Sequence, residues 1–296
     1  MCDETAPGSS QMATSIVDVF PLSSDQTSRL NTFASLAETV ENQVEEKRSF
    51  GEKSADAPVE LVNCEWDHLS LYYPVAVMAY RNIEPILQRG NAQCGFVATA
   101  MAASAVGRRL DVQGMFTWAY NQSLTNIGDL FDIRNLKMLC DRYIGLPSHV
   151  MEFPTKEAMI ADLFQGKVFL VPYDASYETG VPTTFNGYKA HWALLFGVLL
   201  MRQPCEPCMS GLDRLSVYKP IFRGNLEFYE AHMNSGAEYV LAQHGWFNEP
   251  DLWSVEELRE SCCQLNEVDP KSAPEYVLPH GGIREGLRGK VLRLDL

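Results

Sequence analysis

The residues with the clearest chemistry surround a cysteine at the start of a run of small residues. Residues 88–105 read QRGNAQCGFVATAMAASA, in which Cys94 follows a polar, glycine-containing loop and opens a stretch of helix formers. The pattern predicts a thiol at a helix N-terminus, where unpaired backbone N–H groups favour the thiolate and produce a nucleophile near neutral pH. Gly95 would let a substrate backbone approach closely. The alternative is a buried cysteine in an ordinary core helix, and the preceding loop favours the nucleophile.

Gln88 lies six residues before Cys94 in the same loop. This separation is long enough for the loop to fold back and direct the carboxamide N–H at the point where an oxyanion would form beside the sulfur. We therefore predict an oxyanion-stabilising role for Gln88.

A thiolate nucleophile needs a base, and His191 is the best placed histidine. It begins the apolar segment HWALLFGVLL, directly after the flexible segment ETGVPTTFNGYKA. A ring at the mouth of a buried strand is rigidly held and still reachable, and its position about 100 residues after Cys94 fits the chain order of thiol proteases. A third group should orient the imidazole. Three candidates for it remain open: Gln243, Asn248 and Asp251.

Metal and nucleotide sites receive little support. Cys205 and Cys208 have half of a zinc-ribbon spacing, but no second CxxC or HxxxH pair follows. Cys262 and Cys263 are adjacent, and adjacent cysteines rarely bind the same tetrahedral metal ion. The phosphate-binding patterns GxGxxG and GxxxxGKS/T are absent. We predict neither a metal nor a cofactor.

The scaffold that must position these residues divides into two parts by composition. Residues 1–65 hold twelve acidic and four basic residues, and we expect a largely flexible region with one amphipathic helix over about 27–47. From residue 66 to residue 296 a dense apolar pattern continues without a second long linker. This part is predicted to be a single cysteine peptidase domain.

Within 66–296 the first half predicts helices and the second half predicts strands. The expected helices cover 95–106, 111–123 and 132–143. The expected strands cover 168–174, 191–200, 238–243 and 289–296, and a helix over 254–261 interrupts them. Ser254 opens that helix in capping-box spacing with Glu257. Helices followed by a sheet predict an α+β fold with a site at the junction of the halves.

Composition limits the classes of function. The chain has 296 residues, 46% of them hydrophobic, and a formal net charge of −14, which is typical of a globular protein and argues against nucleic-acid binding. No apolar run approaches the ~20 residues needed to cross a bilayer, and the N-terminus lacks a signal-peptide pattern. We expect a cytoplasmic protein that does not bind membranes, with its eight cysteines as reduced thiols.

Five segments in the same order resemble the actin maturation protease family, a papain-like cysteine peptidase group similar to the bacteriocin-leader peptidases. They are LQRGNAQCGFVATAMA, TNIGDLFDIRNLKMLC, VFLVPYDASYETGVPTTFNGYKAHWALLFGVLL, EYVLAQHG with LWSVEELRES, and GGIREGLRGKVLRLDL. They extend from about 84 to 296. The resemblance implies a papain-like fold whose helical first half carries the nucleophile and whose antiparallel sheet carries the histidine.

The resemblance also implies an activity and assigns roles to three residues. It implies an aminopeptidase that removes the acetylated N-terminal residue of actin, either Met or Cys. Cys94 matches the nucleophile of the family, His191 in KAHWA matches its histidine, and Gln88 matches the oxyanion glutamine of the wider fold.

The sequence departs from the family at two places. Vertebrate members have a proline-rich N-terminal region suited to profilin, whereas residues 1–60 hold only Pro7, Pro21 and Pro58, so profilin is a weaker expectation than actin as a partner. The Gly-Lys-Ser that follows a glutamine in the family is replaced by His244-Gly245-Trp246.

Two alternatives to the peptidase are a non-catalytic actin- or profilin-associated adaptor and a thiol hydrolase acting on another acyl or isopeptide substrate. The adaptor is disfavoured because a decayed enzyme would be expected to lose Cys94 or His191. An acidic substrate end would be repelled by an acidic protein. We therefore predict that the nearest basic residues, Arg89 and Lys189, bind the acidic side chains of the substrate.

Overall fold

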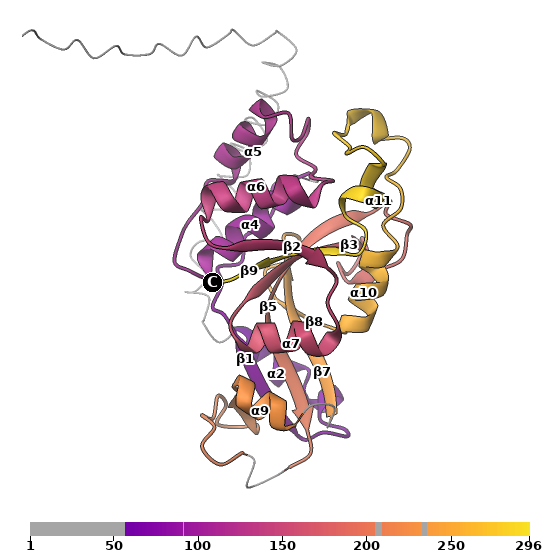
Figure 1. The fold of residues 1–296 in the computed structure, drawn as a ribbon. Helices are drawn as coiled ribbons and strands as arrows, with labels where there is room; N and C mark the ends of the chain where they lie inside the picture. The colour runs from indigo at the N-terminus through magenta and orange to yellow at the C-terminus, as the bar shows by residue number, and fades with distance from the viewer. Residues whose placement is uncertain (1–56, 91, 205–208, 233–235) are drawn as a thin grey trace, which may run out of the picture. The chain divides into compact units, whose positions relative to one another are not determined.

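The computed structural model describes residues 57–90, 92–204, 209–232 and 236–296 (Figure 1). The helix predicted over 27–47 lies outside them, as does the pair Cys205 and Cys208. The first described element is the helix α2 (Ala57–Cys64), which is followed by α3 (Trp66–Leu69).

Most of the longer helices begin where the sequence provides a side-chain cap. These helices are α5 (Val112–Asn121), α6 (Ile133–Tyr143), α7 (Lys156–Phe164) and α10 (Val255–Cys263). Asp111 accepts a hydrogen bond from the N–H of Gln113 at 3.0 Å, and Ser254 accepts one from the N–H of Glu257 at 3.4 Å. Each cap satisfies a backbone donor that the helix itself leaves unpaired. The remaining helices are α4 (Cys94–Ser104), α9 (Leu226–Ala231) and α11 (Gly282–Gly286).

The strands form one mixed sheet built around a long central strand. They are β1 (Val75–Tyr80), β2 (Ser148–Glu152), β3 (Val168–Ala175), β4 (Pro182–Thr183), β5 (Ala190–Arg202), β6 (Ile221–Arg223), β7 (Gly236–His244), β8 (Asp251–Trp253) and β9 (Lys290–Leu294). Along one edge β5 pairs first with β3 and then with β1, and along the other edge it pairs with β7. β9 and β2 extend the sheet beyond β3.

The predicted α+β class is confirmed, with the Cys94 helix before a largely antiparallel sheet. The expectation of a purely helical first half is wrong, because β1 and β2 belong to that half and both join the sheet. β1 also pairs in parallel with the short β6, which departs from the antiparallel pattern. The sequence VAVMAY of β1 is a short apolar run, and such a run does not by itself distinguish a strand from a buried helix segment.

Both faces of the sheet are covered. Tyr173, Ala193 and Leu195 point to one face and pack in a buried cluster with side chains of α7, α9 and α10. Successive side chains of a strand alternate between faces, so Trp192 points to the other face, where a Cβ on Gly95 of α4 would lie only 3.4 Å from the indole ring. In Figure 1, α4, α5 and α6 lie together, apart from α10. The chain therefore buries β5 between two layers.

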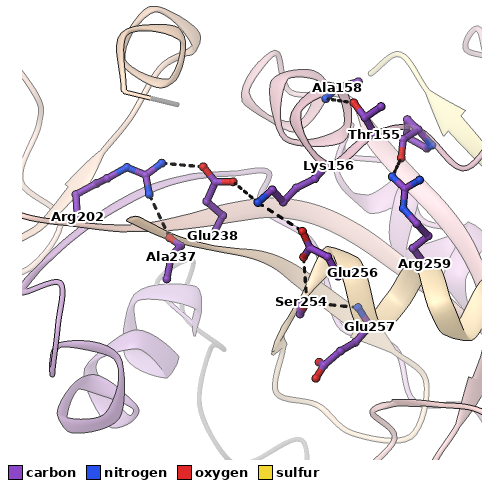
Figure 2. Close-up of polar contacts among 11 residues, drawn as sticks. Thr155, Lys156, Ala158, Arg202, Ala237, Glu238, Ser254, Glu256, Glu257 and Arg259 are labelled. Atoms are coloured by element: carbon purple, nitrogen blue, oxygen red, sulfur yellow. Dashed lines mark hydrogen bonds and ion pairs between the residues drawn. The ribbon is translucent and has the colours of Figure 1, made fainter. Parts of the chain in front are cut away.

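A network of charges, buried at Arg202 and Glu238, lies at the end of β5 that is remote from His191 (Figure 2). Arg202 donates to Glu238 at 3.0 Å, and the second oxygen of Glu238 lies 3.3 Å from the ammonium of Lys156. Lys156 in turn contacts Glu256 at 3.4 Å. The network links β5 and β7 to α7 and α10. Within the described residues, no helix has the length and apolar character needed to cross a membrane.

Candidate active site

Cys94 lies at the first turn of α4, as the sequence predicts. The helix is buried from Cys94 to Ala103 because it is apolar on every side. Gln93, the residue before it, does not cap the helix with its side chain; its Oε1 accepts a hydrogen bond from the N–H of Arg89 at 2.9 Å and closes the preceding loop. Cys94 itself is only 3% exposed.

The expectation of a lowered pKa for the Cys94 thiol is wrong. Burial, with a smaller contribution from the nearby Asp129, raises the pKa of the thiol to about 12. The backbone N–H groups of Trp192, Gly95 and Cys94 hydrogen bond to the sulfur and lower the pKa, but by less. Loss of hydration therefore outweighs the helix terminus, and the resting residue is a neutral thiol.

His191 is the second residue of β5 and faces the same side of the sheet as Tyr173, its partner in β3. The residue is 3% exposed. Burial lowers the pKa of the imidazole to about 3, and the neighbouring His244 contributes to this shift. The resting imidazole is therefore neutral and able to accept a proton.

The structure brings Cys94 next to the strand that carries His191 without joining the two by a hydrogen bond. The sulfur contacts the backbone N–H of Trp192, the residue after His191. In the described residues, His191 Nε2 is buried and has no hydrogen-bond partner. A thiol and an imidazole that are both neutral can act together only if the proton moves during the attack on a substrate.

None of the three candidates for the third group bonds to His191 in the described part of the chain. The amide of Gln243 donates instead to the carbonyl groups of His244 and Phe247, at 3.1 and 2.7 Å. Asp251 lies 3.4 Å from Nε2 of His244. Asn248 is half-buried in the turn after β7.

Aromatic rings surround His191 instead. The ring of Trp246 lies 4.3 Å from the imidazole, Tyr173 lies 5.8 Å away and His244 lies 5.9 Å away, measured between centroids. The sequence reasoning missed these residues. The available signal was the sequence His244-Gly245-Trp246 directly after a predicted strand, where a neighbour of the His191 strand would end.

Gln88 is held against the turn that follows β7. Its backbone N–H donates to the carbonyl of Gly245 at 2.8 Å, and its carboxamide Nε2 donates to Gly90 at 3.0 Å. The carboxamide Oε1 is buried without a partner among the described residues. The donor that we predicted for an oxyanion is therefore occupied within its own loop in this state.

The two predicted substrate-binding cations have different surroundings. Arg89 is exposed in the loop before Cys94. The ammonium of Lys189 lies over two rings, 3.8 Å from the centroid of Tyr177 and 4.2 Å from that of Phe185. Tyr177 also stacks on Trp246 at 6.3 Å. The rings of Tyr177 and Trp246 therefore connect Lys189 to the surroundings of His191.

The loop that carries Lys189 is organised by one buried carboxylate, that of Asp174 in β3. Asp174 accepts hydrogen bonds from the N–H groups of Phe185 and Gly187, both at 2.7 Å, and of Lys189 at 2.8 Å. Gln264 donates a fourth, at 2.6 Å. The loop that leads into His191 is thus fixed from inside the protein.

Asp129 is an acidic residue near Cys94 for which the sequence predicted no role. Burial raises its pKa to about 7, and the charge of Glu275 contributes. It is close enough to Cys94 to raise the pKa of the thiol. Among the described residues, no group of three or more His, Cys, Asp or Glu side chains could hold a metal ion.

Comparisons with known proteins show the family of the chain. A family model described as "Actin maturation protease-like, C-terminal domain" matches residues 83–199. The actin maturation protease of Danio rerio is 30% identical over 232 residues, which cover 73% of this chain and 74% of that protein. The chain belongs to the actin maturation protease family. Cys94 and His191 both lie within the matched domain.

Other comparisons place limits on how far the similarity to the actin maturation proteases extends. The human protein of the same name is 28% identical over 226 residues, and these cover 71% of this chain but 63% of the human chain. The chain therefore spans less than two thirds of the length of that relative. A solved structure of a C39-like peptidase from Bacillus anthracis matches 74% of this chain and 98% of that chain, with 10% identity and a TM-score of 0.39.

Proposed function

We propose that the protein is a cysteine aminopeptidase that removes the acetylated N-terminal residue, Met or Cys, from actin. Cys94 supplies the nucleophile, His191 moves the proton, and Gln88 stabilises the oxyanion. The observation that carries the proposal is the placement of a buried thiol at the start of α4 beside the first residues of β5, where a neutral imidazole is held. Membership of a family whose relatives are named actin maturation proteases supports actin as the substrate.

The reaction begins with the neutral pair. As Sγ of Cys94 attacks the scissile carbonyl carbon, the thiol proton passes to His191 and the carbonyl oxygen becomes an oxyanion. The carboxamide N–H of Gln88 then leaves the carbonyl of Gly90 and donates its hydrogen bond to the oxyanion. The backbone N–H of Cys94 is a second donor to the oxyanion.

The second half of the reaction restores both residues. The imidazolium gives its proton to the amine of the shortened actin, the carbon–nitrogen bond breaks, and an acyl-enzyme remains on Cys94. Water then attacks the thioester while His191 accepts its proton, and the acetylated amino acid leaves as the thiol is re-formed. Because no metal or redox step is needed, the proposal requires no cofactor.

The acidic residues that follow the cleaved bond in the substrate have two candidate partners in this chain. Arg89 precedes the nucleophile and Lys189 precedes the base, so both lie on loops that lead directly into the site. Binding an acidic side chain at Lys189 would compete with the two rings that now hold the ammonium. We therefore expect Lys189 to contribute to kcat/KM through charge-assisted contacts that added salt weakens.

The direct test is incubation of the full chain with N-terminally acetylated peptides of the Met-starting and Cys-starting actin classes, followed by mass spectrometry of the products. We expect loss of one acetylated residue. Cys94→Ala should abolish turnover, and His191→Ala should lower the rate at least ~100-fold, the low end of general acid–base contributions.

The matched control is Cys140→Ala, which removes another fully buried cysteine whose sulfur contacts Thr99 and not the site. Its activity should stay close to that of the wild type once folding is verified. Full activity of Cys94→Ala would contradict the proposal, because the thiol forms the covalent intermediate. If the protein cleaved an isopeptide or thioester but not the actin peptides, Cys94 would still be the nucleophile, but actin would not be the substrate.

A further inference from the structure

His191 lacks the hydrogen-bonded partner that normally fixes a catalytic imidazole. Its Nε2 is buried without a partner in the described residues. The amide of Gln243 is committed to two backbone carbonyls, and Asp251 faces the second histidine, His244. The imidazole must therefore be held in place by something other than these polar groups.

Among the described residues, the aromatic ring nearest to the imidazole is the indole of Trp246. The two ring centroids are 4.3 Å apart and the ring planes differ by 35°, which is closer than any other ring contact of His191. Tyr177 stacks on Trp246 at 6.3 Å and 24°. Tyr177 is 70% exposed, so the order from the protein interior to the surface is His191, Trp246 and Tyr177.

The polar groups near the site fix the turn that carries Trp246. The N–H of Gln88 donates to Gly245 at 2.8 Å, and Gln243 donates to Phe247 at 2.7 Å. The N–H of Trp246 itself lies 3.4 Å from Nδ1 of His244. Hydrogen bonds thus hold the backbone on both sides of Trp246, and the indole contacts the imidazole.

We propose that Trp246 is the positioning residue of His191, replacing a hydrogen-bonded carboxylate or amide, and that Gln243 acts behind it by fixing the turn 244–247. This inference rests on the proposed function in that it takes His191 as the base. The indole excludes water from one face of the imidazole and restricts its rotation, and both effects follow from contact alone. The ring stays neutral until the thiol proton is transferred.

The other groups around His191 define what a pH measurement would report. Tyr173 faces the imidazole from β3 and His244 faces it from β7. Asp251 of β8 lies 3.4 Å from His244, and the sulfur of Cys94 contacts the backbone N–H of Trp192, the residue after His191. Burial is the largest cause of the lowered pKa of His191. Removal of the indole should therefore change the titration of His191 more than removal of Asp251.

The test is NMR titration of the histidine rings in the full chain, with the His191 signal assigned by its loss in His191→Gln. In the wild type we expect His191 to stay neutral from about pH 8 to about pH 5, since its pKa is about 3. In Trp246→Leu the midpoint should rise by at least about one unit, because the ring becomes hydrated. Trp246→Phe retains a ring at this place and should restore most of the wild-type behaviour.

The matched control is Trp118→Phe. Trp118 is another half-buried tryptophan with aromatic and cationic neighbours, Tyr143 and Arg142, on α5 and α6. It should leave the His191 titration unchanged. Tyr177→Leu replaces a 70% exposed ring that contacts Trp246 and the ammonium of Lys189. This variant should fold even if Trp246→Leu does not, and it should raise the midpoint by a smaller amount.

Activity provides the second readout. Trp246→Leu should lower kcat about 10- to 100-fold with little change in KM, as expected when a reacting group is displaced by about 1 Å. The inference is overturned if neither Trp246→Leu nor Tyr177→Leu moves the His191 titration, or if Asn248→Ala or Asp251→Asn moves it more. Because the titration needs no substrate, its result stands even if actin peptides are not cleaved.

Discussion

Strands β5 and β7 run side by side from the candidate active site to the opposite end of the sheet, and each carries buried ionisable groups near both ends. At one end Arg202 and Glu238 are paired, with side chains 3% and 2% exposed, and Lys156 adds a second positive charge (Figure 2). At the other end His191 and His244 are almost as buried. Among the described residues Nε2 of His191 has no hydrogen-bond partner, and Nε2 of His244 has only a 3.4 Å contact with Asp251.

The two ends use buried polar groups for different purposes. At the charged end the groups keep their charges, because each charge has an opposite charge beside it; the burial that would lower the pKa of Lys156 is outweighed by Glu238 and Glu256. At the site end the imidazole of His191 is neutral and its nitrogen is left unpaired. An unpaired buried nitrogen costs stability, and a neutral imidazole is able to accept a proton during a reaction.

The largest expected effect is at the charged end. Glu238→Ala should lower the free energy of unfolding by about 3 to 5 kcal/mol, because it leaves Arg202 buried without a countercharge. Urea denaturation measures this loss. The control Glu256→Ala removes a 64% exposed carboxylate that also contacts Lys156, and it should cost less than about 1 kcal/mol. Equal losses in the two variants would show that burial of the pair does not matter.

The second prediction concerns acid stability at the site end. The pKa of His191 is about 3 in the folded protein and about 6.5 in the unfolded chain, so between these values the unfolded state binds the additional proton. Stability should therefore be lost as the pH falls from about 6.5 towards about 3, by roughly 1.4 kcal/mol per pH unit. His191→Gln should remove this part of the loss, which amounts to about 2 kcal/mol between pH 6.5 and pH 5.

The control for acid stability is His149→Gln. His149 also lies beside an aspartate, 3.3 Å from Asp295, but its side chain is 52% exposed. Unfolding free energies measured at the two pH values should show no gain for this variant. If His191→Gln behaved in the same way as His149→Gln, the imidazole of His191 would be hydrated in the folded protein.

The smallest predicted effect concerns the reactivity of the thiols. Cys94 is buried with a pKa of about 12, whereas Cys64 is exposed. Iodoacetamide should therefore label Cys94 at least about tenfold more slowly than Cys64 in the folded protein, as measured by mass spectrometry of peptides. The two cysteines should react at similar rates in urea. Preferential labelling of Cys94 in the folded protein would show that a thiolate exists there before substrate binds.

The helix positions could be predicted from sequence because their signals are local. Asp111 and Ser254 cap the helices that the apolar periodicity predicts, within a few residues. The sequence also predicts that Cys94 and the strand of His191 lie close together, from a helix start followed about 100 residues later by an apolar strand. The low pKa expected for Cys94 was wrong because desolvation depends on residues distant in the sequence, among them Trp192 and Asp129.

The surroundings of His191 could not be predicted for a similar reason. Trp246 reaches the imidazole only through the pairing of β5 with β7, in which Ala193 lies opposite His244. A long excursion that includes β6 and α9 separates these strands in the sequence, so nothing local specifies their register. The sequence also does not show that Gln243 bonds to backbone carbonyls or that Asp251 lies against His244 and not against His191.

The Asp174 network also bears on the chemical ageing of the protein. Asn186-Gly187 is the kind of dipeptide that deamidates, a reaction in which the glycine nitrogen attacks the asparagine side chain and closes a succinimide. Here the N–H of Gly187 donates to Asp174, and the side chain of Asn186 accepts a hydrogen bond from Asn266 at 2.8 Å. Both partners of the ring closure are held apart from each other while the loop is folded. Isoaspartate at position 186 would thus mark molecules in which the loop leading into His191 has opened.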